Sequence, residues 1–396
     1  MKLIAPVFIL FISFQINIYS QEIESPKFGK GLFNLVGKDS SWTMKIGTRF
    51  QFLASNLMAE GQNPATNFLI RRARLKFDGF AVSPKLKYKI ELGLSNRDMS
   101  GVSQFTGNTP RYVMDAVIKY NFYENFVLWV GQTKLPGNRE RVISSANMQQ
   151  VDRSILNARF NIDRDIGFQL RHHFTLFNDF LIREIFALSQ GEGRNVVTGN
   201  LGGHQYTGRI ELLPFGKFKG KGDYFGSDLK REQKPKLAIG VTYDHNNDAV
   251  KTRSNMGSWM VTDTGFHETN INTLFIDSMF KYKGFSLMTE YAVRDADDPI
   301  ARNSDGTETG DVVQIGEGIN IQGGYLFKNN WEISGRYSGV TLDENITGKN
   351  PEQQYTFGIS KYIVGHSLKV QTDFSLIDFE NQSDQYLYRL QFDIHF

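Results

Sequence analysis

The sequence predicts an all-β protein, a transmembrane antiparallel up-and-down β-barrel of about 16 strands. Three observations predict it: apolar and polar residues alternate through the chain after Ser40, the connections alternate between short and long, and aromatic residues gather at the short ones. In such a barrel only every second residue faces lipid. A membrane protein can therefore have the low mean hydropathy of −0.35 found here.

The N-terminus is predicted to be a cleaved signal peptide at residues 1–20, because Lys2 precedes an apolar run that ends at the small residue Ser20. An uncleaved membrane anchor would need about 20 apolar residues, and this run is shorter. The remaining chain divides into an N-terminal periplasmic segment at 21–40 and the barrel at 41–396. The signal peptide predicts secretion through the inner membrane and residence in a bacterial outer membrane.

The composition excludes several other classes of protein. The 45 Lys and Arg against 42 Asp and Glu give a net charge of +3, too small to indicate a nucleic-acid partner. With no cysteine there is no disulfide framework, no thiolate metal site and no cysteine nucleophile.

Period-2 alternation predicts the individual strands. The last stretch shows it most clearly: Tyr386, Tyr388 and Leu390 share one face, whereas Arg389 and Gln391 share the other. The predicted strands lie near 42–54, 68–79, 85–95, 112–122, 126–134, 165–176, 180–190, 204–213, 236–246, 270–282, 285–294, 312–327, 331–341, 353–363, 367–379 and 385–396.

The connections predict the topology. Short turns such as Tyr123–Asn125 and Lys283–Gly284 alternate with long segments, at 55–67, 96–111, 135–164, 191–203, 247–269, 295–311 and 342–352. Tight periplasmic turns and long external loops have this rhythm, and an even strand number places both termini on the periplasmic side. One connection breaks the alternation, the long segment from Pro214 to Pro235, which we interpret as an extended periplasmic turn.

Basic residues on the faces expected to line the lumen are the first functional candidates. If Leu69, Ala73, Leu75 and Phe77 face lipid, the pore-lining residues of this hairpin are Arg72, Arg74, Lys76, Lys85, Lys87 and Lys89. Arg71 then falls on the lipid-facing side. In a narrow pore, rings of such side chains attract anions. The alternative is a merely polar lumen in which acids such as Asp78 and Glu91 balance the bases.

Signals of catalysis and metal binding are weak. The stretch Gly284 to Met288 lacks the last glycine of a G-x-S-x-G motif, and adjacent His172 and His173 point to opposite faces of a strand. The segment around Asp305 lacks the acids that a calcium loop needs at its first and last positions. The sequence therefore predicts no catalytic residues, no metal site and no cofactor.

Several short stretches occur in a characteristic order over residues 29–176. They are Gly29-Lys30-Gly31-Leu32, Arg49-Phe50-Gln51, Ile70-Arg71-Arg72-Ala73-Arg74-Leu75-Lys76-Phe77-Asp78-Gly79, Asp115-Ala116, Gly131-Gln132-Thr133-Lys134-Leu135-Pro136 and Arg164-Asp165-Ile166-Gly167-Phe168-Gln169-Leu170. In these stretches the chain resembles the phosphate-selective porins O and P, in the divergent form found in Bacteroidetes-like genomes. Where that family tends to have a Pro-Pro-Phe-Ser-like run, this chain has Leu135-Pro136-Gly137-Asn138.

The resemblance implies a sixteen-stranded barrel in outer-membrane lipid, usually a homotrimer, whose basic lumen draws small anionic solutes, phosphate among them. It also implies that the terminal Phe396 is a signal read by the barrel assembly machinery. A loop at the place of 135–164 folds into the lumen in sixteen-stranded porins, which makes Arg139, Arg141, Arg153 and Arg159 candidates for a constriction. The alternative for this loop is a mobile external position.

Two hypotheses of different class follow. The first is a passive diffusion channel for small hydrophilic solutes with a preference for anions. The second is a barrel plugged by its long loop, which serves as a surface-binding or scaffold protein. An outer-membrane hydrolase is a more distant third possibility.

Overall fold

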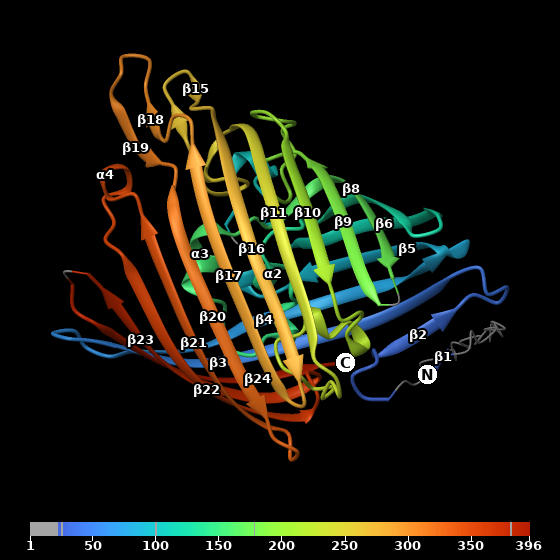
Figure 1. Ribbon diagram of the computed structural model, residues 1–396. Helices are drawn as coiled ribbons and strands as arrows, with labels where there is room; N and C mark the ends of the chain where they lie inside the picture. Colours follow the sequence, from blue (N-terminus) through green and yellow to red (C-terminus); the bar gives the residue numbers. More distant parts are fainter. Residues whose placement is uncertain (1–22, 25–26, 100, 178, 381) are drawn as a thin grey trace, which may run out of the picture.

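The computed structural model describes residues 23–24, 27–99, 101–177, 179–380 and 382–396. It is a closed antiparallel barrel, and Figure 1 shows its strands surrounding an interior that holds short helices. Of the 18 strands in the main sheet, β1 and β2 are short flanking strands, and the other sixteen form the barrel. The predicted signal peptide at 1–20 lies outside the described residues.

The barrel closes where the last strand, β24, pairs with the first, β3, in the register Phe392↔Phe52. In order around the wall, the barrel strands are β3 (Thr43–Ala59), β4 (Ala65–Ala81), β5 (Ser83–Gly93), β6 (Val113–Tyr123), β7 (Phe126–Lys134), β8 (Arg164–Leu176), β9 (Phe180–Ser189), β10 (Gln205–Leu213), β11 (Lys236–Ala249), β16 (Thr269–Tyr282), β17 (Phe285–Ala296), β20 (Gly316–Leu326), β21 (Trp331–Leu342), β22 (Glu352–Val364), β23 (Leu368–Phe379) and β24 (Gln385–His395). All sixteen predicted strands are therefore confirmed.

The remaining elements are not part of the barrel wall. At the end of the barrel with the short turns, which we call the turn end, β2 pairs with β3 and β1 pairs with β2. The full set of elements that do not belong to the wall is β1 (Ile23–Glu24), β2 (Phe33–Val36), α1 (Asn96–Met99), η1 (Gln104–Thr106), α2 (Arg139–Val142), η2 (Ser145–Asn147), α3 (Ile155–Phe160), η3 (Lys219–Tyr224), β12 (Lys251–Arg253), β13 (Met256–Trp259), β14 (Val261–Thr262), β15 (Gly265–Phe266), β18 (Ile300–Arg302), β19 (Glu308–Val312) and α4 (Glu344–Thr347). None of the helices among the described residues is long and apolar enough to cross a membrane.

At the opposite end, which we call the loop end, three small hairpins replace parts of the predicted loops and of one predicted strand. The pairs β12–β13, β14–β15 and β18–β19 each form a separate two-stranded sheet. The strand predicted at 312–327 starts only at Gly316, because residues up to Val312 pair with β18 in one of these hairpins. Period-2 alternation in an external hairpin cannot be told apart from alternation in the wall.

Side chains on the barrel wall alternate as expected between an outer apolar face and an inner polar face. Phe357 on β22 is 55% exposed outside, whereas its inward neighbours Thr356 and Gly358 face the interior. Aromatic side chains with large exposed outer surfaces surround the turn end, among them Tyr120, Phe122, Phe177, Phe327 and Trp331. Rings of this kind suit a membrane interface, where an amphipathic side chain meets both lipid and water.

A β-bulge in β4 corrects one prediction about the lumen. Gln51 pairs with Arg72, but the next residue, Phe52, pairs with Ile70, so Arg71 is the extra residue of the bulge. The extra residue shifts the alternation by one position. Arg71 therefore points inward, where its Nη2 atom donates to Asp152 at 2.9 Å. Leu69 pairs with the inward-facing Leu53, and the large exposed outer surfaces are those of Phe68 and Ile70. The prediction that Arg71 and Leu69 face lipid was wrong.

Candidate functional site

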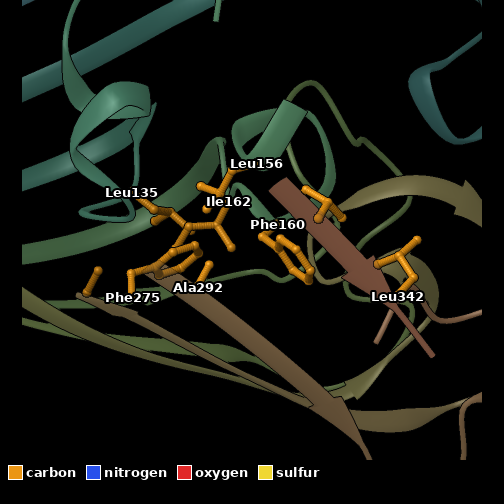
Figure 2. Close-up of a cluster of buried hydrophobic side chains, with 9 residues drawn as sticks. Leu135, Leu156, Phe160, Ile162, Phe275, Ala292 and Leu342 are labelled. Carbon is orange, nitrogen blue, oxygen red and sulfur yellow. The ribbon is translucent and has the colours of Figure 1, made fainter. Parts of the chain in front are cut away.

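The loop at 135–163 lies inside the barrel, not outside it, as α2 and α3 show in Figure 1. Its apolar residues pack against inward residues of the wall in a buried cluster (Figure 2). Leu156, Phe160 and Ile162 of the loop are fully buried against Phe275 of β16 and Ala292 of β17. A mobile external loop is thereby excluded, because a segment packed in this way is part of a folded core.

Polar contacts bind the same loop to the far wall. Inward residues at alternate positions of β23 each reach the loop: Lys369 Nζ donates to the Met148 carbonyl at 3.0 Å, and Asp373 accepts from the Val151 amide at 3.1 Å. Glycine at Gly358 makes room for this approach, because a side chain there would overlap Gln150. The loop thus fills the half of the lumen beside β16 to β23.

The four predicted loop arginines have different environments. Arg139 is fully buried, with its Nε atom 2.7 Å from Asp277 Oδ1, so it anchors the loop. Arg141 is paired with Asp163, and Arg159 Nη2 lies 2.9 Å from Glu352 Oε2. Arg153 donates to the Glu140 carbonyl at 3.0 Å, and burial together with Arg141 lowers its pKa to about 9. Arg141, Arg153 and Arg159 line cavities, but Arg139 contacts carboxylates of the wall.

The connection at 214–235 is the second segment inside the barrel. It joins β10 to β11 at the turn end, as predicted, but it extends into the lumen, where Lys281 Nζ donates to the carbonyls of Gly222 and Ser227, at 2.7 Å each. Its Gly226 amide also donates to the Asn147 carbonyl of the loop at 2.8 Å. The two internal segments therefore contact each other.

The predicted pore-lining residues on β4 and β5 face inward, but most of them are paired with acids. Arg74 Nη1 lies 2.8 Å from Glu91 Oε1, and Arg74 Nη2 lies 2.8 Å from Asp98 Oδ1. Lys76 is paired with Asp78 at 2.7 Å, and Lys89 with Glu91 at 2.7 Å. The register places Lys76 opposite Glu91 and Asp78 opposite Lys89. Lys76 and Lys89 therefore each lie opposite an acid of the neighbouring strand and not opposite another cation.

The other predicted lumen residues differ in burial. Arg72 is 3% exposed, donates to Gln51 and lies 3.8 Å from Asp152. Burial alone would raise the pKa of Asp152, but Arg71 and Arg72 outweigh it and hold that pKa far below its usual range. Lys85 and Lys87 are exposed near the turn end of β5.

A series of adjoining cavities runs between the internal segments and the wall from β3 to β10. A loop-end vestibule of about 450 Å³ shares Arg164 and Arg194 with an upper cavity of about 450 Å³. The upper cavity shares Arg74 and Lys134 with a central chamber of about 520 Å³. From the chamber, two cavities of about 350 Å³ each reach the turn end, one beside Phe396 and the other beside Asn125.

Basic residues dominate this path. Eight Lys and Arg line the central chamber against two acids, Glu91 and Asp115. The vestibule has six basic residues against Asp163 alone. Such an excess of fixed positive charge raises the local concentration of anions.

Two cations of the central chamber are held by an aromatic ring instead of an acid. Lys119 Nζ of β6 lies 3.7 Å from the centre of the Trp129 ring, and Arg171 Cζ of β8 lies 3.9 Å from it. Among the described residues, no carboxylate lies within ion-pair distance of Lys119 or Arg171. The sequence analysis missed both, although they stand at alternate, inward positions of predicted strands and that alternation could have identified them.

Two further residues beside the vestibule, outside the barrel strands, have shifted pKa values. Burial, reinforced by Arg111, lowers the pKa of Lys251 to about 8. Burial also raises the pKa of Glu192 to about 7, and Lys251 Nζ donates to the Glu192 backbone carbonyl at 3.1 Å. In the part of the chain that the structure describes, no cluster of three or more His, Asp or Glu could hold a metal ion.

A closed barrel with an apolar outer face and a charged path through its polar interior defines an outer-membrane channel of the porin class. The sequence profile of the phosphate-selective porin O and P family matches residues 44–387, and the chain belongs to this family. No curated protein sequence matches the chain.

Solved structures agree in fold. The anion-selective porin from Comamonas acidovorans has a TM-score of 0.55 at 9% identity, over 90% of this chain and 100% of that one. A loop-deletion mutant of OmpT from Vibrio cholerae has a TM-score of 0.55 at 10% identity, with the same coverage. OprB of Pseudomonas putida has a TM-score of 0.52 at 10% identity, over 90% of this chain and 95% of that one. At these identities the likeness shows the fold alone.

Proposed function

We propose that this porin is a passive diffusion channel for small hydrophilic solutes that prefers anions, phosphate among them, and that it has no catalytic role. The observation that carries the proposal is the cavity path from the loop end to the turn end, in which cations outnumber acids in both the vestibule and the central chamber. Family membership and the anion-selective porin among the similar folds support it.

The source of the preference differs from that expected from the sequence. Most cations of β4 and β5 are neutralised by neighbouring acids, as the alternative of a balanced polar lumen expects. The anion preference is instead assigned chiefly to Lys119 and Arg171, which lie against the Trp129 ring and form no ion pair in the part of the chain that the structure describes. Water in the lumen screens their mutual repulsion while leaving a positive potential.

In this account the protein resides in outer-membrane lipid as a homotrimer after insertion by the barrel assembly machinery. The similarity to OmpT of Vibrio cholerae, one form of which is described as a trimer, supports the oligomeric state (TM-score 0.52, 11% identity). The terminal aromatic Phe396, which follows the last strand, supports the assembly route.

A second candidate function, a plugged barrel that binds partners at the cell surface, has an observation in its favour. Two buried apolar clusters fix the internal segments against the wall, and a segment so packed does not move aside readily. Single-channel recording in planar lipid bilayers distinguishes the two functions. The channel predicts discrete current steps in potassium chloride, whereas a plugged barrel passes no steady current.

A further inference from the structure

The central chamber has two chemically different sides. It lies between the wall from β4 to β10 and the two internal segments, and both contribute to its lining. All its basic residues except Lys221 come from the wall or from its end at Lys134 and Arg164. The internal segments contribute the side chains of Pro136, Val142, Tyr224 and Phe225, together with the polar or small residues Ser144, Asn147, Gly220 and Lys221.

On the cationic side, Lys119 and Arg171 form no ion pair with an acid among the described residues. Trp129 separates Lys119 from Arg171, so the ring holds both cations without neutralising them. Arg171 also donates to Gln169 Oε1 at 2.8 Å, a neutral partner that fixes the guanidinium group and leaves its charge available.

Contacts with neighbouring residues hold the apolar side chains of the chamber in place. Tyr224 Oη donates to Glu211 Oε2 at 2.8 Å, and the Phe225 ring lies 5.4 Å from the ring of His366. Val142 is followed by Ile143, a member of the buried apolar cluster that also contains Phe218. From the wall, Ile185 adds a further apolar side chain to the lining.

We propose that the chamber selects organic anions that carry an apolar body, such as aromatic sulfonates and carboxylates, over small anions with the same headgroup. The proposal rests on the anion-channel function and names the solute class that fits this chamber. The headgroup lies toward Lys119 and Arg171, and the ring lies toward Val142, Tyr224 and Phe225. A cavity of about 520 Å³ holds a ring of this size.

The physical reason is the difference between the two sides. A small inorganic anion is stabilised only by its attraction to the cations, because the apolar side chains along its path offer it no favourable interaction. An aromatic anion of equal charge gains the same attraction and, in addition, removes apolar surface from water on both itself and the chamber. Partial burial of one phenyl ring corresponds to about a tenfold difference in affinity.

The test compares two probes that share a headgroup, benzenesulfonate and methanesulfonate, as blockers of chloride current through the full-length porin in planar bilayers. We expect half-block by benzenesulfonate at about a tenfold lower concentration. In the variant Val142→Thr with Ile185→Thr, which replaces apolar groups of the lining with hydroxyls and shortens the side chain at 185 by one carbon, that ratio should fall toward one. The control Val261→Thr, at an exposed position of the loop end, should retain the wild-type ratio.

Equal half-blocking concentrations for the two sulfonates in the wild-type channel would overturn the inference, whether or not the double variant folds. Failure of the underlying function gives a different result. A channel without chloride preference refutes the anion-channel proposal itself. A chloride-preferring channel that both sulfonates block at the same concentration refutes only the proposal that the chamber selects anions with an apolar body.

Discussion

Arg139 of the internal loop and Asp277 of β16 form a fully buried ion pair, with Arg139 Nε 2.7 Å from Asp277 Oδ1. Asp277 also accepts from Arg209 at 2.6 Å, and Arg139 lies 3.4 Å from Glu211. Breaking a buried pair is costly because the remaining charge loses its partner. This network fixes the loop that sets the width of the path.

Replacing Arg139 should therefore release the loop. For Arg139→Met we expect the free energy of unfolding to fall by about 3 kcal/mol. The single-channel current should become larger and noisier. Asp277→Asn should cost more, because it weakens contacts to two arginines. Urea unfolding in detergent measures the first effect, and bilayer recording measures the second.

The matched control is Arg302→Met at the loop end. Its partner Glu308 lies at 3.3 Å, but Arg302 is 41% exposed, so its loss should cost less than about 1 kcal/mol and leave the current unchanged. Wild-type stability and current in Arg139→Met would show that this ion pair does not hold the loop.

The vestibule predicts how the channel responds to pH. Lys251, with a pKa of about 8, loses its positive charge as the pH rises through that value. Glu192, with a pKa of about 7, gains a negative charge in the same direction. Both changes make the vestibule less positive, so chloride preference should fall between about pH 6 and pH 9.

Reversal potentials at these two pH values measure the effect. In Lys251→Met with Glu192→Gln the preference should vary little with pH, whereas Lys283→Met at the turn end should behave as the wild type does. Wild-type preference that is constant over this range, or that rises, would contradict the assignment.

The C-terminus makes a prediction about assembly. Phe396 packs edge-on against Phe28 at 5.2 Å, and its amide donates to the Thr48 carbonyl at 3.0 Å. Deletion of Phe396 should lower the amount of protein in the outer membrane without altering secretion across the inner membrane. Phe396→Leu, which keeps an apolar terminus, should leave more protein in the outer membrane than the deletion does. Immunoblots of membrane fractions measure both, and normal levels after deletion would argue against the assembly role.

The strands could be predicted from sequence because each obeys a rule of local alternation. The bulge at Arg71 could not, since one extra residue leaves the composition of β4 unchanged and is specified by pairing with β3. The position of 214–235 inside the barrel was missed for a similar reason. Its contacts, such as that of Lys281 with Gly222, join residues distant in the sequence.

The candidate site was only partly predictable. Inward orientation of Arg74 and Lys89 followed from alternation, but their pairing with Glu91 depends on cross-strand register, which alternation alone does not set. Lys119 and Arg171 flank Trp129 because three strands, β6 to β8, are adjacent in this register. The sequence of any one of these strands does not predict that arrangement.

The central claim is that cations of the central chamber give this porin its preference for anions. The most direct measurement is the reversal potential in a gradient of potassium chloride at low ionic strength, for the wild type, for Lys119→Gln with Arg171→Gln, and for Lys85→Gln with Lys87→Gln. The two variants lose the same charge, one pair in the chamber and the other at exposed positions near the turn end. We predict chloride preference in the wild type that shrinks with added salt, a loss of most of it in the chamber variant, and little change in the other. Potassium preference in the wild type, or equal losses in both variants, would contradict the account.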